Sequence, residues 1–148
     1  MTFSPSTPRN LWRLFLKTEV LTIHSRAREE IIDLTSQIQS LVERLNIRDG
    51  LLAFFVPHTT AAITINENAD PDVKRDILFK LRSVFPRDDA YQHSEGNSDA
   101  HIKSSLVGHS LTIVVENGQL LLGTWQGILF CEFDGPRARK VYIKSLSA

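Results

Sequence analysis

Residues 111–146 read LTIVVENGQLLLGTWQGILFCEFDGPRARKVYIKSL, and their apolar runs and turn signals decide the fold class. Two apolar segments, 111–115 and 119–123, lie on either side of Asn117-Gly118. An Asn-Gly pair between such segments is the strongest short-range hairpin signal, because both residues tolerate the positive φ angles of a tight turn. This part of the chain therefore predicts an antiparallel β-hairpin.

The C-terminal region predicts two more strands. Residues 125–133 form a mostly apolar run, and Asp134-Gly135-Pro136 follows as a turn. Residues 139–146 alternate between apolar and polar side chains, as an edge or half-exposed strand does. Further upstream, the apolar runs 51–56 and 61–65 predict two buried strands, separated by a short segment that starts with a proline.

The N-terminal third predicts two strands and a helix. Residues 11–23 contain β-branched and aromatic residues in partial alternation, which indicates a strand. Residues 30–35 could open the following helix or form a short strand. The strand is favoured, because Thr35 or Ser36 then makes a good helix N-cap. One face of the helix that follows carries Ile38, Leu41, Val42 and Leu45.

A second helix is predicted to start at Asp70-Pro71. Aspartate is a favoured N-cap and proline is favoured at the first helical position. The apolar face of this helix is expected to contain Val73, Ile77, Leu78 and Leu81. Pro86 ends the helix. The next segment, 87–109, is polar and is expected to be a long loop that lies on the surface or lines a cleft.

Many strands and two main helices, not strictly alternating, predict an α+β fold built on one curved antiparallel sheet. The length of 148 residues fits one domain of common size. We assign residues 11–148 to this single domain. Residues 1–10 are polar and contain several Ser and Pro residues, and we expect them to form a disordered tail.

Composition excludes several classes of protein. Lys+Arg and Asp+Glu both number 17, so the formal net charge is zero, which argues against a nucleic-acid partner. Cys131 is the single cysteine and lies in an apolar run, so we expect a buried, unreactive thiol, no disulfide and a cytoplasmic location. No apolar run approaches the roughly 20 residues of a membrane helix, so we expect no membrane partner.

Three histidines are candidate site residues. His58 directly follows a buried strand, where a rigid element would position its side chain. His93 and His101 lie in the long polar segment, which could fold back over the end of that strand. Three histidines with an open fourth position form a common catalytic zinc site. Histidines so far apart in sequence could equally be unrelated surface groups.

Other polar residues are weaker candidates. Glu67 could be a general base or could orient a histidine, but it could also be a solvated charge at the entry of a helix. The triplet Lys103-Ser104-Ser105 is of a kind that holds phosphate or carboxylate, although most such triplets lie on the surface. Near the last turn, four charged residues could form either a structural ion-pair cluster or an anion site: Glu132, Asp134, Arg137 and Arg139.

Three blocks of the chain resemble the YjbQ-like family of small intracellular proteins. They are PHTTAAITINENADPDV at 57–73, YQHSEGN at 91–97 with AHIKSSLVG at 100–108, and NGQLLLGTWQGILFCEFDGPRAR at 117–139. The similarity extends over residues 11–147. The blocks are long and specific, so the chain is identified as a member of this family.

The resemblance implies a barrel-like, mostly antiparallel sheet with two main helices, and assembly as a homotrimer. It also implies a polar cleft that gathers His58, His93 and His101 as catalytic or metal-binding residues. A divalent metal, zinc or magnesium, could occupy the cleft, and three histidines could also bind phosphate without one. Similarity to the family further favours these residues as catalytic or ligand-binding: Asn66, Glu67, Asn68, Lys103, Ser104, Ser105, Trp125, Gln126 and Glu132.

For function, the resemblance implies a secondary thiamine-phosphate synthase activity. Such a transferase would couple a pyrimidine pyrophosphate to a thiazole phosphate. One alternative is a metal-dependent hydrolase of a small substrate, with a metal-bound water as nucleophile and Glu67 as base. Another is a trimer that binds a small, phosphorylated ligand without catalysing a reaction.

Overall fold

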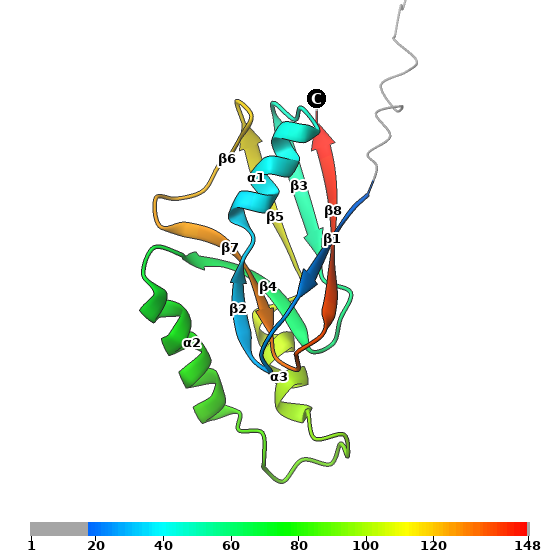
Figure 1. Ribbon diagram of the computed structural model, residues 1–148, viewed down its shortest axis with the longest axis vertical. Helices are drawn as coiled ribbons and strands as arrows, with labels where there is room; N and C mark the ends of the chain where they lie inside the picture. Colours follow the sequence, from blue (N-terminus) through cyan, green and yellow to red (C-terminus); the bar gives the residue numbers. More distant parts are fainter. Residues whose placement is uncertain (1–17, 148) are drawn as a thin grey trace, which may run out of the picture.

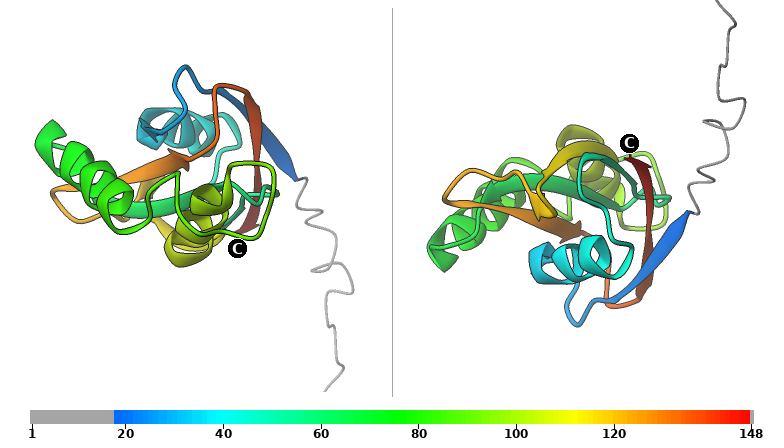
Figure 2. Two further views of the ribbon diagram at one scale, coloured as in Figure 1. Left: turned by 90° about the horizontal axis from the view of Figure 1, so that it is seen from below. Right: turned by 90° about the horizontal axis from the view of Figure 1, so that it is seen from above.

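Two antiparallel sheets curl together into an open half-barrel (Figures 1 and 2). The computed structural model describes residues 18–147, so the predicted tail and the first part of the predicted 11–23 strand lie outside the described residues. Within the described residues there are eight strands and three helices. The predicted α+β class with a mostly antiparallel, barrel-like arrangement is confirmed, although it is built from two sheets.

The larger sheet has five strands in the order β1-β8-β3-β5-β6. These strands are β1 (Glu19–His24), β8 (Ala138–Ser147), β3 (Gly50–Phe55), β5 (Ser110–Glu116) and β6 (Gln119–Leu120). The predicted hairpin is confirmed, since β5 and β6 pair around Asn117 and Gly118, whose φ angles are 51° and 76°. Its second strand is shorter than the predicted 119–123.

The smaller sheet has three strands in the order β2-β7-β4. They are β2 (Glu30–Asp33), β7 (Gln126–Glu132) and β4 (Ala61–Glu67). Every residue of β7 after Gln126 is buried, which explains its continuous apolar sequence. A backbone hydrogen bond from the Ile63 amide of β4 to the Gly108 carbonyl, just before β5, connects the two sheets.

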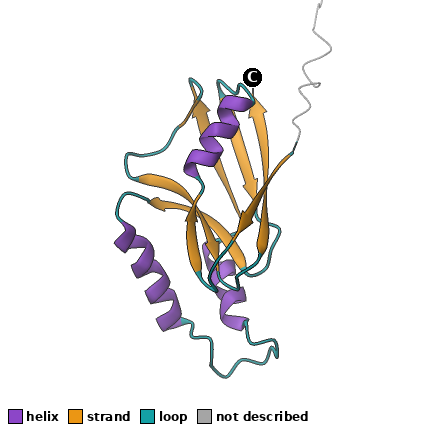
Figure 3. Cartoon of the chain, in the orientation of Figure 1, coloured by secondary structure: helices purple, strands orange, loops and turns teal. Residues whose placement is uncertain are grey.

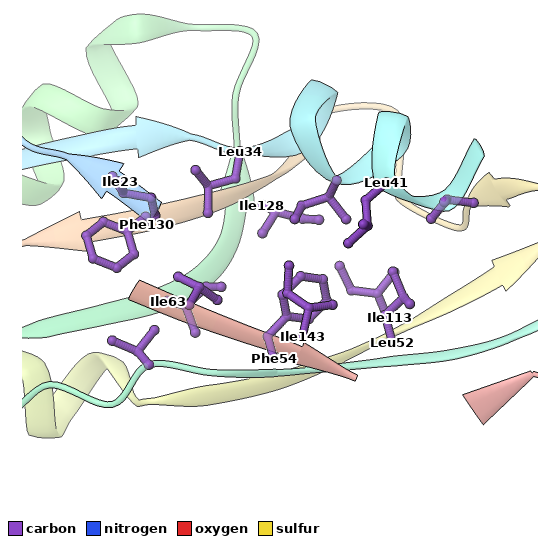
Figure 4. Close-up of a cluster of buried hydrophobic side chains, with 14 of the residues drawn as sticks. Ile23, Leu34, Leu41, Leu52, Phe54, Ile63, Ile113, Ile128, Phe130 and Ile143 are labelled. Carbon is purple, nitrogen blue, oxygen red and sulfur yellow. The ribbon is translucent and has the colours of Figure 1, made fainter. Parts of the chain in front are cut away.

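The two sheets and helix α1 (Thr35–Arg44) share one apolar core (Figure 4). Its central side chains come from all three elements: Ile38, Leu41, Val42, Leu52, Phe54, Ile63, Ile128, Phe130 and Ile143. The predicted α1 face is therefore confirmed at three of its four positions, and Leu45 packs against the core from outside the helix. The Asp33 carboxylate accepts hydrogen bonds from the Thr35 amide and hydroxyl, in place of a cap from Thr35 or Ser36.

Helix α2 (Pro71–Val84) starts as predicted, because the Asp70 side chain accepts a hydrogen bond from the Asp72 amide at 2.9 Å. None of its side chains is buried, however. The apolar face predicted for it is only half-covered, with Ile77 and Leu81 lining a shallow groove over the smaller sheet. Figure 3 shows that α2 lies to one side of the sheets.

The prediction of an unbroken loop over 87–109 is wrong, because residues Ser98–Val107 form helix α3. Its buried side chains are Asp99, Ala100, Lys103 and Ser104. Three of these are polar or charged, so the helix lacks the apolar periodicity by which helices are recognised in a sequence. Ion pairs take the place of apolar contacts on its buried face. Among the helices of residues 18–147, none has the length and apolarity needed to cross a membrane.

Candidate functional site

A polar pocket of about 350 Å³ is lined by residues of three segments: the β3–β4 connection, the start of α3 and the β7–β8 turn. Its lining comes from all three segments: Pro57, His58, Thr59, Thr60, Glu95, Asn97, His101, Asp134, Arg137 and Arg139. Two of the three predicted histidines are among them. A volume of this size is within the range of about 300–1,000 Å³ that small-molecule pockets have.

His58 is held as a neutral imidazole with a defined tautomer. Its Nε2 atom accepts a hydrogen bond from the Lys140 backbone amide at 2.8 Å. Desolvation lowers the pKa of His58 below the usual 6.5, and the nearby positive charge of Arg139 lowers it further. A neutral imidazole that accepts at Nε2 carries its proton on Nδ1. His58 therefore has one N–H donor left for a ligand.

Arg139 is fixed by a buried carboxylate behind the pocket. Its Nε and Nη2 atoms donate to the two Glu132 oxygens at 2.9 and 2.6 Å, and Nη2 also donates to the Thr60 hydroxyl. Burial alone would raise the pKa of Glu132, but hydrogen bonds from Arg139, the Asp134 amide and Ser25 outweigh it and lower the pKa. Glu132 is thus a carboxylate that orients Arg139. It is fully enclosed and is not among the residues that line the pocket, although the sequence predicted it as a ligand-binding residue.

Arg137 and Asn97 lie at the mouth of the pocket and share one carboxylate. Asp134 accepts from Asn97 Nδ2 at 2.9 Å and from Arg137 Nη2 at 3.1 Å. The Oδ1 atom of Asn97 is buried and has no hydrogen-bond partner among the described residues. A buried acceptor without a partner is costly, so Oδ1 is suited to accept a hydrogen bond from a ligand.

His93 is separated from His58 by His101. The rings of His93 and His101 lie edge to face with their centroids 5.3 Å apart, and His93 Nε2 is 3.5 Å from a Glu95 oxygen. Within residues 18–147, no three His, Cys, Asp or Glu side chains are grouped so that they could hold a metal ion. The three predicted histidines are therefore not gathered into such a group within the described part of the chain, and His58 uses Nε2 internally. A metal at this site stays a prediction.

Another group of predicted residues lies at the opposite end of β4 from His58. Glu67 pairs with Gln126 across β4 and β7, and the Asn68 amide donates to the Trp125 carbonyl at 2.8 Å. The side chain of Asn66 accepts from the Glu67 amide. Seven residues of extended strand separate the two groups by about 23 Å. Within one chain, Glu67 is therefore out of reach of the polar pocket.

Two residues of the predicted anion-binding triplet, Lys103 and Ser104, are buried, whereas Ser105 is exposed. Lys103 is 1% exposed, and its ammonium donates to Asp99 at 2.8 Å and to Glu29. Ser104 donates to the Thr59 carbonyl, and Ser105 donates to the His101 carbonyl. None of the three residues lines the polar pocket, and the polar groups of Lys103 and Ser104 are used to attach α3 to the rest of the protein. Direct ligand binding by the triplet stays a prediction.

Sequence reasoning missed Asn97 and Glu95, and it left Asp134, Arg137 and Arg139 as either structural or anion-binding. Asn97 could have been found as the N-cap residue of α3, because asparagine is favoured at that position. The polar sequence of α3 hid the helix itself, and therefore its N-cap. Cys131 is buried as expected, and burial raises the pKa of its thiol to about 12, so it is not a nucleophile at neutral pH.

A model of the family described as UPF0047 protein YjbQ-like matches residues 19–148. The chain belongs to the YjbQ-like family. It is 56% identical over 122 residues to a UPF0047 protein of Methanocaldococcus jannaschii, and the aligned region covers 82% of this chain and 88% of the relative. It is 52% identical over 132 residues to the UPF0047 protein YugU of Bacillus subtilis, covering 88% and 98% of the two chains.

Solved structures of YjbQ-like proteins share the fold. The crystal structure of an uncharacterized family member from Clostridium acetobutylicum aligns with a TM-score of 0.84 at 53% identity, covering 86% of this chain and 99% of that one. A hypothetical protein from Aeropyrum pernix K1 aligns with a TM-score of 0.85 at 36% identity, covering 90% and 100%. The family assignment made from the three sequence blocks is confirmed.

The first prediction concerns the buried lysine of this YjbQ-like chain. Lys103→Ala leaves the Glu29 and Asp99 carboxylates less well compensated inside the protein, and we expect the free energy of unfolding to fall by about 2–4 kcal/mol. Urea denaturation measures it. Lys80→Ala removes an exposed lysine from α2 and should change the free energy by less than about 0.5 kcal/mol. Equal stability of the two variants would contradict the structural role of Lys103.

The second prediction concerns pH. The folded-state pKa of His58 is lowered from 6.5, so the folded protein binds this proton less readily than the unfolded chain does. Above pH 6.5 His58 is neutral in both the folded and the unfolded state, so its full contribution to the free energy of unfolding is present. Below pH 6.5 the unfolded chain takes up the proton first, and this contribution is lost. His58→Gln keeps an acceptor for the Lys140 amide but cannot titrate. We expect its unfolding free energy, measured from pH 7 to 5, to fall less steeply than that of the wild type; parallel curves would refute the account.

Proposed function

We propose that the polar pocket binds the phosphate group of a small molecule. The observation that carries this proposal is the convergence of three donor side chains, Arg137, Arg139 and His58, on one pocket. Guanidinium groups match the geometry of phosphate oxygens and stay charged at neutral pH. The Nδ1–H group of neutral His58 adds a donor that does not depend on protonation.

The hydrogen bonds inside the protein leave donors on both arginines for a ligand. Among the described residues, Arg139 donates through Nε and Nη2, and Arg137 donates through Nη2. The remaining side-chain N–H groups of Arg137 and Arg139 make no hydrogen bond among the described residues; Arg137 is half exposed and Arg139 is 3% exposed. Glu132 and Asp134 balance part of the positive charge, so they lower the attraction for an anion, but they also hold each guanidinium in place before binding.

The start of α3 adds a further favourable contribution. Asn97 is the N-cap residue of this ten-residue helix, and both Asn97 and His101 line the pocket. The N-terminal end of a helix carries a partial positive charge and free amide groups, which favour an anion nearby. The buried Oδ1 atom of Asn97 would accept a hydrogen bond from a hydroxyl or protonated phosphate oxygen of the ligand.

The reaction we propose for this pocket is the thiamine-phosphate synthase activity that the family resemblance implies. In that reaction pyrophosphate leaves the pyrimidine when the thiazole phosphate replaces it. Arg137 and Arg139 would stabilise the negative charge that develops on the leaving pyrophosphate. The hydrolase alternative has less support, because it needs a metal-bound water and places the base on Glu67, at the far end of β4.

Pyrophosphate binding tests the proposed function. We expect calorimetric titration to show binding by the wild type, and Arg137→Ala to weaken it by at least about tenfold, since a hydrogen bond to a charged group contributes about 1.5–3 kcal/mol. The matched control is Arg75→Ala, which removes an exposed arginine from α2 and should bind as the wild type does. Absence of binding, or equal affinities of the two variants, would refute the phosphate site.

The same proteins separate transfer from binding alone. Thiamine phosphate formation from the pyrimidine pyrophosphate and the thiazole phosphate should occur with the wild type and with Arg75→Ala, and should be lost with Arg137→Ala. If the wild type binds pyrophosphate but forms no thiamine phosphate, the protein binds its ligand without catalysing the transfer, and the transferase proposal is excluded. The homotrimer implied by the resemblance stays a prediction.

A further inference from the structure

A second pocket of about 400 Å³ lies next to the phosphate pocket and shares His101 with it. Its other lining residues come from the end of the α2–α3 connection and from the first turns of α3: Tyr91, Gln92, His93, Ser98 and Ile102. The two pockets differ in chemistry. The phosphate pocket is predominantly polar, whereas the surface of the second pocket is almost entirely carbon.

Helix α3 divides the two pockets. Residues three and four positions apart lie on the same side of a helix. Asn97 and His101 are four apart and line the phosphate pocket, while Ser98 and Ile102 are four apart and line the second pocket. His101 therefore stands at the boundary between a polar compartment and an apolar one.

Three of the six residues that line the second pocket carry rings: Tyr91, His93 and His101. His93 packs edge to face against His101, and Tyr91 lies on the same segment two residues before His93. The Tyr91 hydroxyl donates to the Pro86 carbonyl at 2.8 Å, and its amide donates to the Asp89 carbonyl at 2.7 Å. These bonds fix the tyrosine in its loop. Ring side chains favour stacked or edge-to-face contact with another planar ring.

We propose that the second pocket binds a planar aromatic ring of the same molecule whose phosphate group occupies the first pocket. This inference rests on the proposed phosphate site and adds the surface on which the ring of an aromatic phosphate ester would lie. His101 would lie beside the link between ring and phosphate. A sugar phosphate of equal charge fits less well, because its hydroxyl groups would lose water against a carbon surface without gaining partners.

Three simple probes test the ligand class: inorganic phosphate, glycerol phosphate and phenyl phosphate. We expect phenyl phosphate to bind the wild type at least about tenfold more tightly than glycerol phosphate, the ratio expected from burying one ring. Equal affinities of the two esters would overturn the ring site while leaving the phosphate site in place. Failure of all three probes to bind would remove the phosphate site, and the ring site with it.

A matched pair of variants locates the ring. Ile102→Asn places a polar side chain in the second pocket, and we expect the ratio of phenyl phosphate to inorganic phosphate affinity to fall by at least about fivefold. Leu106→Asn makes the same change one turn later on α3, at an exposed position outside this pocket, and should keep the wild-type ratio.

A second variant serves if Ile102→Asn does not fold. His93 is 46% exposed, so His93→Ala should fold normally, and it removes one ring from the wall. We expect the same affinity ratio to fall by about threefold, because part of the ring's contact surface is lost. An unchanged ratio in His93→Ala, or in a folded Ile102→Asn variant, would overturn the assignment of the second pocket.

Discussion

The buried ion pair between Glu132 and Arg139 is the interaction on which the pocket depends. Glu132 ends β7 of the smaller sheet, and Arg139 lies near the start of β8 in the larger sheet, so the pair connects the two sheets. Both side chains are at most 3% exposed. Removing two charges from water is costly, and the pair is tolerated because Ser25, Thr60 and the Asp134 amide provide further hydrogen bonds.

The geometry of the pocket follows from this pair. Arg139 is held with one edge against Glu132, which leaves its other edge for the pocket. The next residue, Lys140, donates its amide to His58, so the strand that positions the arginine also sets the tautomer of the histidine. The positive charge of Arg139 helps to keep that histidine neutral. The guanidinium of Arg139 therefore takes part in a structural ion pair and also lines the polar pocket.

The sequence predicted those features that depend on apolar periodicity and turn chemistry. The strands around Asn117-Gly118, the buried strand β7 and the α2 start at Asp70 were predicted because each has a local signal. Helix α3 was missed because its buried face carries Asp99 and Lys103, which pair with partners distant in sequence, Arg28 and Glu29. The i,i+4 spacing of Asp99 and Lys103 is a local helix signal, but nothing local shows that this charged face is buried.

The site was predictable only in part, for the same reason. The sequence predicts one cleft with His58, His93 and His101; His58 and His101 line one pocket, whereas His93 lines the neighbouring one. The resemblance grouped Glu67 and Trp125 with them, but the extended β4 strand holds those residues at its other end. The four charged residues near the β7–β8 turn had two possible roles in the sequence. The structure separates these roles: Glu132 is enclosed, while Asp134, Arg137 and Arg139 line the pocket.

The most direct measurement of the central claim is the pyrophosphate affinity of Glu132→Gln, compared with wild type under conditions where circular dichroism shows both proteins folded. The substitution has two opposite effects on pyrophosphate affinity, so the direction of the change shows which effect is larger. Removing a negative charge near the pocket should by itself strengthen anion binding, whereas loss of the carboxylate that orients Arg139 should weaken it. The account predicts affinity weaker by at least about fivefold. Affinity equal to or tighter than that of wild type would contradict it.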